Sequence, residues 1–166
     1  LMLLQTIDSI EYAVYSLMKR QSEQNLLYSE IRFAPQLHTK KGLSQEEVVT
    51  ASLKGRQKYF DELRQKENIK EGDIPSFYSN IILCCMRGNG NERENEETIR
   101  IAAEFLSDSD GVVAVDLAGA EALFPTSDYE KLFAHARAEG IPFTIHAGEA
   151  AGPESIRQAV DYGTEG

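Results

Sequence analysis

Hydrophobic positions along this chain follow two rhythms, one typical of amphipathic helices and the other typical of buried strands. Near the start, one helix face is indicated by Leu3, Ile7, Ile10, Val14 and Leu17. Short apolar runs bounded by proline or glycine predict strands at Leu26–Phe33, Ile81–Cys85, Val112–Leu117 and Pro142–His146. The second of these runs is apolar at every position, which is typical of a strand covered on both faces.

Helix signals lie between these strands. Ser44 with Glu47, and Ser127 with Glu130, have the spacing of capping boxes, which begin helices. Gly140 stands where a left-handed glycine closes a helix. Helix and strand therefore alternate, which predicts an α/β protein with a parallel sheet. The TIM-type (β/α) barrel and the open doubly wound sheet both fit, although no G-x-G-x-x-G follows the first strand.

Composition restricts the partners. Of the 166 residues, 42% are hydrophobic and 27% are charged, the balance of a globular domain. A net charge of −10 repels phosphate backbones and anionic lipids, so we expect no nucleic acid and no membrane partner. No apolar run is long enough to cross a bilayer. Cys84 and Cys85 are adjacent on a strand and point to opposite faces, so we expect two buried, reduced thiols in a cytoplasmic protein.

Ionisable residues gather where the predicted strands end, and in parallel α/β folds chemistry takes place at those ends. We expect one rim to carry Glu30, Arg87, Asp116, Gly119 and His146. Structural ion pairing is the favoured role for the two carboxylates among them, with Arg32 or Arg87 as the partner. A turn is the favoured role for Gly119, and close approach of a ligand is the alternative.

His146 is the strongest candidate for a metal ligand. It closes an apolar strand, and a neutral imidazole is a common zinc ligand. Glu149 follows across a glycine turn and would carry a proton over the same pocket. The alternative is a strand-end histidine bonded to backbone beside a solvated acid, and spacing alone favours it. His38 is expected to be solvated, and His135 to be half-buried on a helix.

Four segments resemble successive strand motifs of the adenosine deaminase family, in the family's order and spacing. They are Tyr28–His38, Ile82–Arg87, Val115–Gly119 and Thr144–Glu149. The Asp-Leu-Ala-Gly sequence ending at Gly119 and the His-Ala-Gly-Glu sequence ending at Glu149 are specific when they occur together. The resemblance extends over nearly the whole chain.

This resemblance implies a zinc-dependent (β/α)₈ barrel that hydrolyses the 6-amino group of adenosine or 2′-deoxyadenosine, a step of purine salvage. His146 would be a zinc ligand, Glu149 would protonate purine N1, and the Gly119 N–H would bind purine N3. The family's other zinc ligands have no counterpart among His38, His135 and His146. We therefore expect residues 1–166 to be a single segment of one barrel catalytic domain, truncated at both ends, with about four strands.

The sequence leaves competing interpretations open. The substrate would be adenosine, adenine or a modified adenosine, because the sugar contacts lie mostly outside this segment. As given, the chain would be a non-catalytic half-barrel that binds no zinc by itself, since a catalytic zinc needs three protein ligands. Open sheet edges at the first and last strands would favour self-association.

Overall fold

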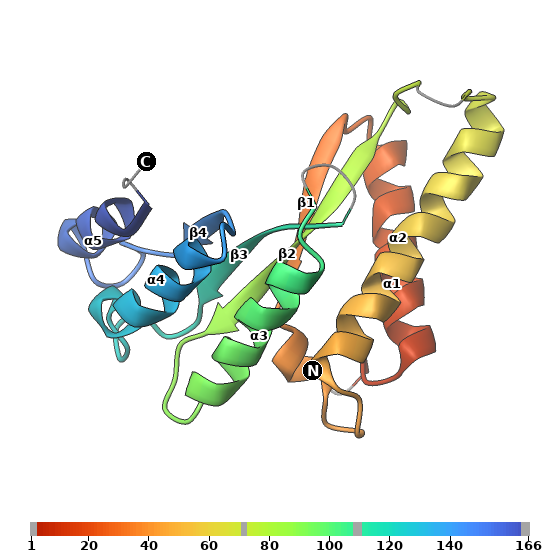
Figure 1. The fold of residues 1–166 in the computed structure, drawn as a ribbon. Coiled ribbons are helices and arrows are strands. Elements are labelled where there is room, and N and C mark those ends of the chain that lie inside the picture. The colour runs from red at the N-terminus through yellow and green to blue at the C-terminus, as the bar shows by residue number, and fades with distance from the viewer. Residues whose placement is uncertain (1–2, 71–72, 108–110, 164–166) are drawn as a thin grey trace. The chain divides into compact units, whose positions relative to one another are not determined.

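The computed structural model describes residues 3–70, 73–107 and 111–163, in which helices and strands alternate (Figure 1). The strands are β1 (Tyr28–Phe33), β2 (Tyr78–Met86), β3 (Val112–Ala118) and β4 (Phe143–Ile145). The helices are α1 (Ile7–Glu23), α2 (Gln45–Glu67), α3 (Glu92–Glu104), α4 (Glu130–Ala138) and α5 (Pro153–Gly163). Two short 3₁₀ turns are present: η1 (Pro35–His38) follows β1, and η2 (Thr126–Tyr129) precedes α4.

The strands form one parallel sheet with the order β1-β2-β3-β4, as the alternation of elements predicts. In the last pair, Asp116 lies beside Thr144 and Leu117 lies beside Ile145. β1 and β4 are the outer strands in this order. Ser79–Cys85 of β2 is buried at every position, so the continuous apolar run is a central strand.

The chain divides into two compact units, one formed by residues 1–31 and 37–81 and the other by residues 32–36 and 82–166. Whether residues 1–166 belong to a single barrel domain stays a prediction. None of the described helices combines the length and apolarity that a membrane span requires.

In the first unit, α1 and α2 pack against each other. α1 buries Ile10, Val14 and Met18. The first two belong to the predicted face, and Met18 is buried in place of the predicted Leu17. Leu3 and Ile7 are exposed, because Leu3 precedes the Thr6 cap and Ile7 lies on the first turn. The shared core is an aliphatic and aromatic cluster comprising Val14, Met18, Ile31, Tyr59, Phe60, Leu63 and Phe77.

Two other helix and loop predictions differ in outcome. The capping box of Ser44 with Glu47 is present at the start of α2. The box predicted for Ser127 with Glu130 is wrong, because Ser127 lies within η2 and α4 begins at Glu130 without a side-chain cap. His38 is buried rather than solvated, because its Nδ1 lies 2.7 Å from the Leu4 carbonyl oxygen.

The second unit supplies the ends of β2, β3 and β4 together with α3, α4 and α5. Asn95 of α3 is buried and forms two hydrogen bonds with the last residue of β2. Its Oδ1 accepts from the Met86 N–H at 2.8 Å, and its Nδ2 donates to the Met86 carbonyl at 3.0 Å. Phe133 of α4 packs on Phe143 of β4, with ring centroids 4.8 Å apart. These contacts fix the positions of two strand ends.

Gly55 sets the separation of α1 and α2, because a Cβ atom there would lie 2.3 Å from the Glu11 carbonyl oxygen. We expect Gly55→Ala to lower the free energy of unfolding by about 1–3 kcal/mol through overpacking, despite a gain of about 1 kcal/mol in helix propensity. Urea denaturation of the protein measures the change.

Gly163→Ala is the matched control, since the added Cβ would meet only Phe143, at an ordinary 3.8 Å. It should leave stability unchanged or raise it slightly. A Gly55→Ala protein as stable as the Gly163→Ala protein would contradict the close-packing explanation.

Candidate active site

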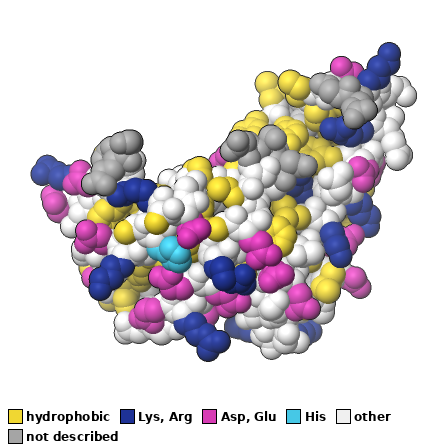
Figure 2. All heavy atoms as spheres, in the orientation of Figure 1, with side chains coloured by type: hydrophobic (Ala, Val, Ile, Leu, Met, Phe, Trp, Pro, Cys, Tyr) yellow, Lys and Arg dark blue, Asp and Glu magenta, His cyan; other side chains and the backbone are white. Residues whose placement is uncertain are grey.

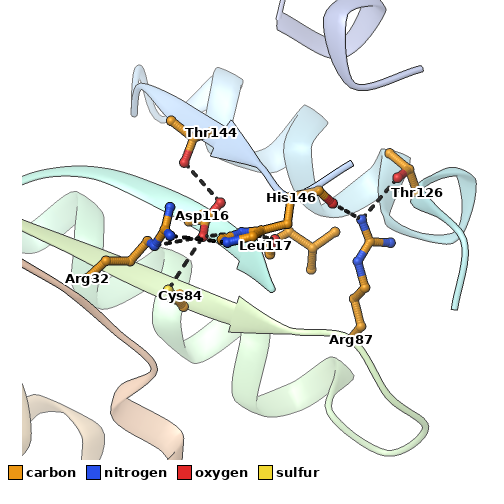
Figure 3. Close-up of polar contacts among 8 residues, drawn as sticks. All are labelled: Arg32, Cys84, Arg87, Asp116, Leu117, Thr126, Thr144 and His146. Atoms are coloured by element: carbon orange, nitrogen blue, oxygen red, sulfur yellow. Dashed lines mark hydrogen bonds and ion pairs between the residues drawn. The ribbon is translucent and has the colours of Figure 1, made fainter. Parts of the chain in front are cut away.

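A buried carboxylate joins all four strands at this site. Asp116 of β3 is fully buried. Its Oδ1 accepts from the Thr144 hydroxyl at 2.9 Å, and its Oδ2 lies 2.9 Å from His146 Nδ1 and 3.4 Å from Arg32 Nε (Figure 3). Cys84 of β2 donates its thiol to the same Oδ2 at 3.6 Å. A buried charge is stable only when it is paired and hydrogen-bonded, and Asp116 is both.

The contacts of His146 fix its tautomer. Its Nδ1 faces two acceptors, Asp116 Oδ2 at 2.9 Å and the Leu117 carbonyl at 3.1 Å, so Nδ1 carries the proton. The lone pair therefore belongs to Nε2, which lies 3.1 Å from Arg32 Nη2. A carboxylate behind Nδ1 is the usual support of a histidine that binds metal through Nε2. His146 therefore bonds backbone through Nδ1, as one interpretation of the sequence expects, while its Nε2 lone pair accepts from Arg32.

A pocket of about 240 Å³ opens beside these groups. It is lined by Arg32, Asp116, Thr144, Ile145, His146, Ala147 and Glu149. Glu149 is exposed at its edge. The structure therefore places the predicted ligand and the predicted proton carrier on one pocket.

The predicted rim is confirmed for Arg87, Asp116, Gly119 and His146. The Arg87 N–H donates to the Ala118 carbonyl at 2.8 Å, and the His146 N–H donates to the Leu117 carbonyl at 3.0 Å. Both bonds join residues at the carboxyl ends of adjacent strands. Glu30 lies in the other compact unit, exposed and bonded to the Tyr28 hydroxyl at 2.8 Å, and its place on the rim stays a prediction.

Gly119 lies beside Arg87 and is not among the residues lining the pocket. Its φ of +122° is unfavourable for other residues, and a Cβ would lie 3.2 Å from Arg87 Cβ. Both facts require glycine here, and the choice between a turn role and close approach of a ligand stays a prediction. They also keep the backbone at this strand end bare.

Arg32 forms the predicted ion pair with Asp116, but Arg87 binds differently. Its guanidinium donates to two backbone carbonyls, those of Phe124 and His146, each at 2.7 Å. His135 is half-buried as predicted, and its Nδ1 lies 2.6 Å from Glu96 Oε2, a contact that periodicity does not indicate.

Sequence reasoning missed the groups that shape the loop after β4. Glu121, Thr126 and Ser155 are buried and bond to one another or to this loop. The one available signal was an acid two residues after Gly119, next to a strand end. Four hydrogen bonds, first from Ser155 and then from backbone amides, hold the pKa of Glu121 down at about 2.

The residues present fit one ligand of a metal site. His146 offers Nε2, supported by Asp116, and a metal bound there would replace the Arg32 guanidinium now facing that atom. Across the described part of the chain, no three His, Cys, Asp or Glu side chains are arranged to hold a metal ion.

Solved structures that resemble the chain share its fold. An adenine deaminase from Arthrobacter aurescens matches with a TM-score of 0.75 at 22% identity, covering 96% of this chain and 44% of that one. A zinc-bound amidohydrolase from Burkholderia ambifaria matches with a TM-score of 0.77 at 19% identity, covering 95% and 40%. An N6-methyl-AMP deaminase from Arabidopsis thaliana matches with a TM-score of 0.73 at 20% identity, covering 96% and 45%. The fold is therefore that of part of a TIM-type (β/α) barrel.

The adenosine deaminase family model matches residues 1–164, and the chain belongs to that family. An adenosine deaminase from Haemophilus ducreyi is 48% identical over 164 residues, which are 98% of this chain and 44% of that protein. The corresponding protein of Enterococcus faecalis is 35% identical over 161 residues, 96% of this chain and 43% of its own length. The chain thus spans less than half the length of these relatives.

We expect Cys84 and Cys85 to react with iodoacetamide only after unfolding. Both thiols are buried and free. Burial, with the Asp116 charge as a smaller cause, raises the pKa of Cys84 to about 12, and burial raises the pKa of Cys85 further. The reactive thiolate is therefore scarce at pH 8. Peptide mapping of protein labelled with and without urea measures this, and rapid labelling of either residue in native protein would contradict the buried site.

Proposed function

We propose that the complete protein containing this segment catalyses the hydrolytic deamination of adenosine and 2′-deoxyadenosine to inosine and 2′-deoxyinosine, releasing ammonia. The observation that carries the proposal is the Asp116–His146 contact: it puts the His146 lone pair on Nε2, where Arg32 now donates, at a pocket that Glu149 also lines. Family membership and the 48% identity to an adenosine deaminase support it. The reaction would belong to purine salvage in the cytoplasm.

His146 would be one zinc ligand, held in the correct tautomer by Asp116 and bound through Nε2. One zinc ion per complete site would supply the Lewis acid that makes water a nucleophile near neutral pH. The other ligands would come from outside this segment. The zinc in the Burkholderia amidohydrolase of the same fold is consistent with this assignment.

Glu149 would act as the proton donor. Attack of water at purine C6 moves negative charge onto N1, and a carboxylic acid at that position stabilises the charge by giving up its proton. The side chain is exposed at the pocket edge, three residues after His146, where it can reach a bound ring. The bare backbone at Gly119 would donate its N–H to purine N3.

Adenine or a modified adenosine is the second candidate substrate. It is favoured by structural neighbours named as an adenine deaminase and an N6-methyl-AMP deaminase. Parallel assays with adenosine, 2′-deoxyadenosine, adenine and N6-methyl-AMP would separate these candidates by kcat/KM. Preference for either of the last two would replace the proposed substrate while keeping the reaction class.

In the complete protein, we expect Glu149→Gln to retain zinc and lose roughly 10²- to 10⁴-fold in kcat, because an amide cannot supply the proton. His146→Ala should lose zinc, because it removes a ligand. Glu154→Gln is the matched control, since Glu154 is exposed and pairs with nearby Arg157. Metal analysis with a deamination assay checks all three, and near-normal turnover of Glu149→Gln would refute the assigned role.

Residues 1–166 expressed alone should neither bind zinc tightly nor deaminate adenosine, since the described residues offer no three-ligand cluster. The outer strands β1 and β4 carry backbone groups that can pair with another copy, so we expect self-association. Light scattering after size exclusion, with metal analysis, tests both points. A monomer that holds one zinc and produces inosine would contradict them.

A further inference from the structure

The loop after β4 is bonded at both its start and its end by buried charged side chains to which no role has been assigned. Residues 146–151 run from the predicted ligand His146, through the predicted proton donor Glu149, to the approach of α5. Arg87 bonds the first residue of this loop and Glu121 bonds later ones, and both are buried. All of these residues belong to one compact unit.

The carboxylate of Glu121 binds the backbone amides around Glu149. Its Oε1 accepts from the Gly148 N–H at 2.7 Å. Its Oε2 accepts from the Ala150 N–H at 2.7 Å and from the Ala151 N–H at 3.3 Å. Successive amides pointing to one spot form a concavity that binds anions, and here the anion is a side chain of the same protein.

Gly148 makes this arrangement possible. Its φ is +81°, and a Cβ would lie 2.4 Å from Ile156 Cγ1. The left-handed turn directs the amides toward Glu121, while the side chain of Glu149 remains free at the pocket edge. The two amides flanking Glu149 in this loop are thus fixed to opposite oxygens of one carboxylate.

Arg87 holds the other end of the loop by donating Nη2 to the His146 carbonyl at 2.7 Å (Figure 3). The same Nη2 lies 3.0 Å from the Thr126 hydroxyl. That hydroxyl lies 2.7 Å from the Ser155 hydroxyl, which donates to Glu121 Oε1 at 2.5 Å. Because Arg87 can only donate and the Glu121 carboxylate can only accept, the Thr126 hydroxyl donates to Ser155 and the Ser155 hydroxyl donates to Glu121. The bonds of such a chain strengthen one another.

We propose that Glu121 is a positioning residue for the reaction: through the amides of Gly148 and Ala150 it holds the backbone of Glu149, and the chain to Arg87 ties that position to His146. This proposal rests on the proposed function. The pKa of Glu121 is lowered to about 2, so its carboxylate remains charged at every pH at which the enzyme would work.

The test uses the complete zinc-loaded protein. Glu121→Gln replaces one oxygen with an NH₂ group that faces amide donors, so kcat should fall on the order of 10- to 100-fold. KM and zinc content should stay near their original values, since the affected interaction acts in the transition state. Glu154→Gln, on the exposed side of α5, should be unchanged.

The decisive measurement is a double-mutant cycle. In a Glu149→Gln background, Glu121→Gln should cause no further loss in kcat, because Glu121 acts through Glu149. Thr126→Val, a near-isosteric change that breaks the chain at one hydroxyl, should give a smaller loss with the same dependence on Glu149. Glu121→Asp should recover part of the activity. Equal losses in both backgrounds, or no loss in either, would overturn the proposal.

Hydrogen exchange separates this inference from the proposed function. The amides of residues 148–151 should exchange faster in Glu121→Gln than in the parent protein, whether or not adenosine is the substrate. If the parent protein fails to deaminate adenosine while this exchange increases, the proposed function is wrong and the loop anchor remains. Unchanged exchange in Glu121→Gln would reject the anchor itself.

Discussion

The burial of one carboxylate organises this segment. Asp116 has no exposed surface, so its charge must be satisfied from within, and its neighbours on the other three strands supply the partners. Because the strands are parallel, those partners lie together toward the carboxyl ends of the strands. The same contact that satisfies Asp116 also orients His146, so stability and site geometry have a common origin.

Surface charge contributes little to this arrangement. Figure 2 shows acidic and basic side chains interspersed over the face in view, without a continuous basic patch among the described residues there. The chemistry lies instead in partly sheltered polar groups at strand ends. This distribution agrees with the net charge of −10.

Periodicity predicted the alternation of elements and the strand ends well, because burial on a sheet or helix leaves a regular pattern. It predicted α1 less well: Leu3 and Ile7 match the helical spacing but lie outside the buried stripe. The pocket residues His146 and Glu149 were found because each follows a strand. Glu121 was given no role because, apart from the Ser155 hydroxyl, the partners described for it are the backbone amides of Gly148, Ala150 and Ala151, and a backbone donor has no signature in the side-chain sequence.

The Glu121 carboxylate, which binds the amides of the loop after β4, affects how this site can be moved to another scaffold. The His-Ala-Gly-Glu sequence by itself would leave several converging amides without an acceptor, and a foreign barrel would relax the turn to satisfy them. A graft would therefore need to carry Glu121 and Ser155 as well, although Glu121 lies 27 residues before Gly148 and 34 residues before Ser155. The transferable unit is a discontinuous set of residues rather than a linear motif.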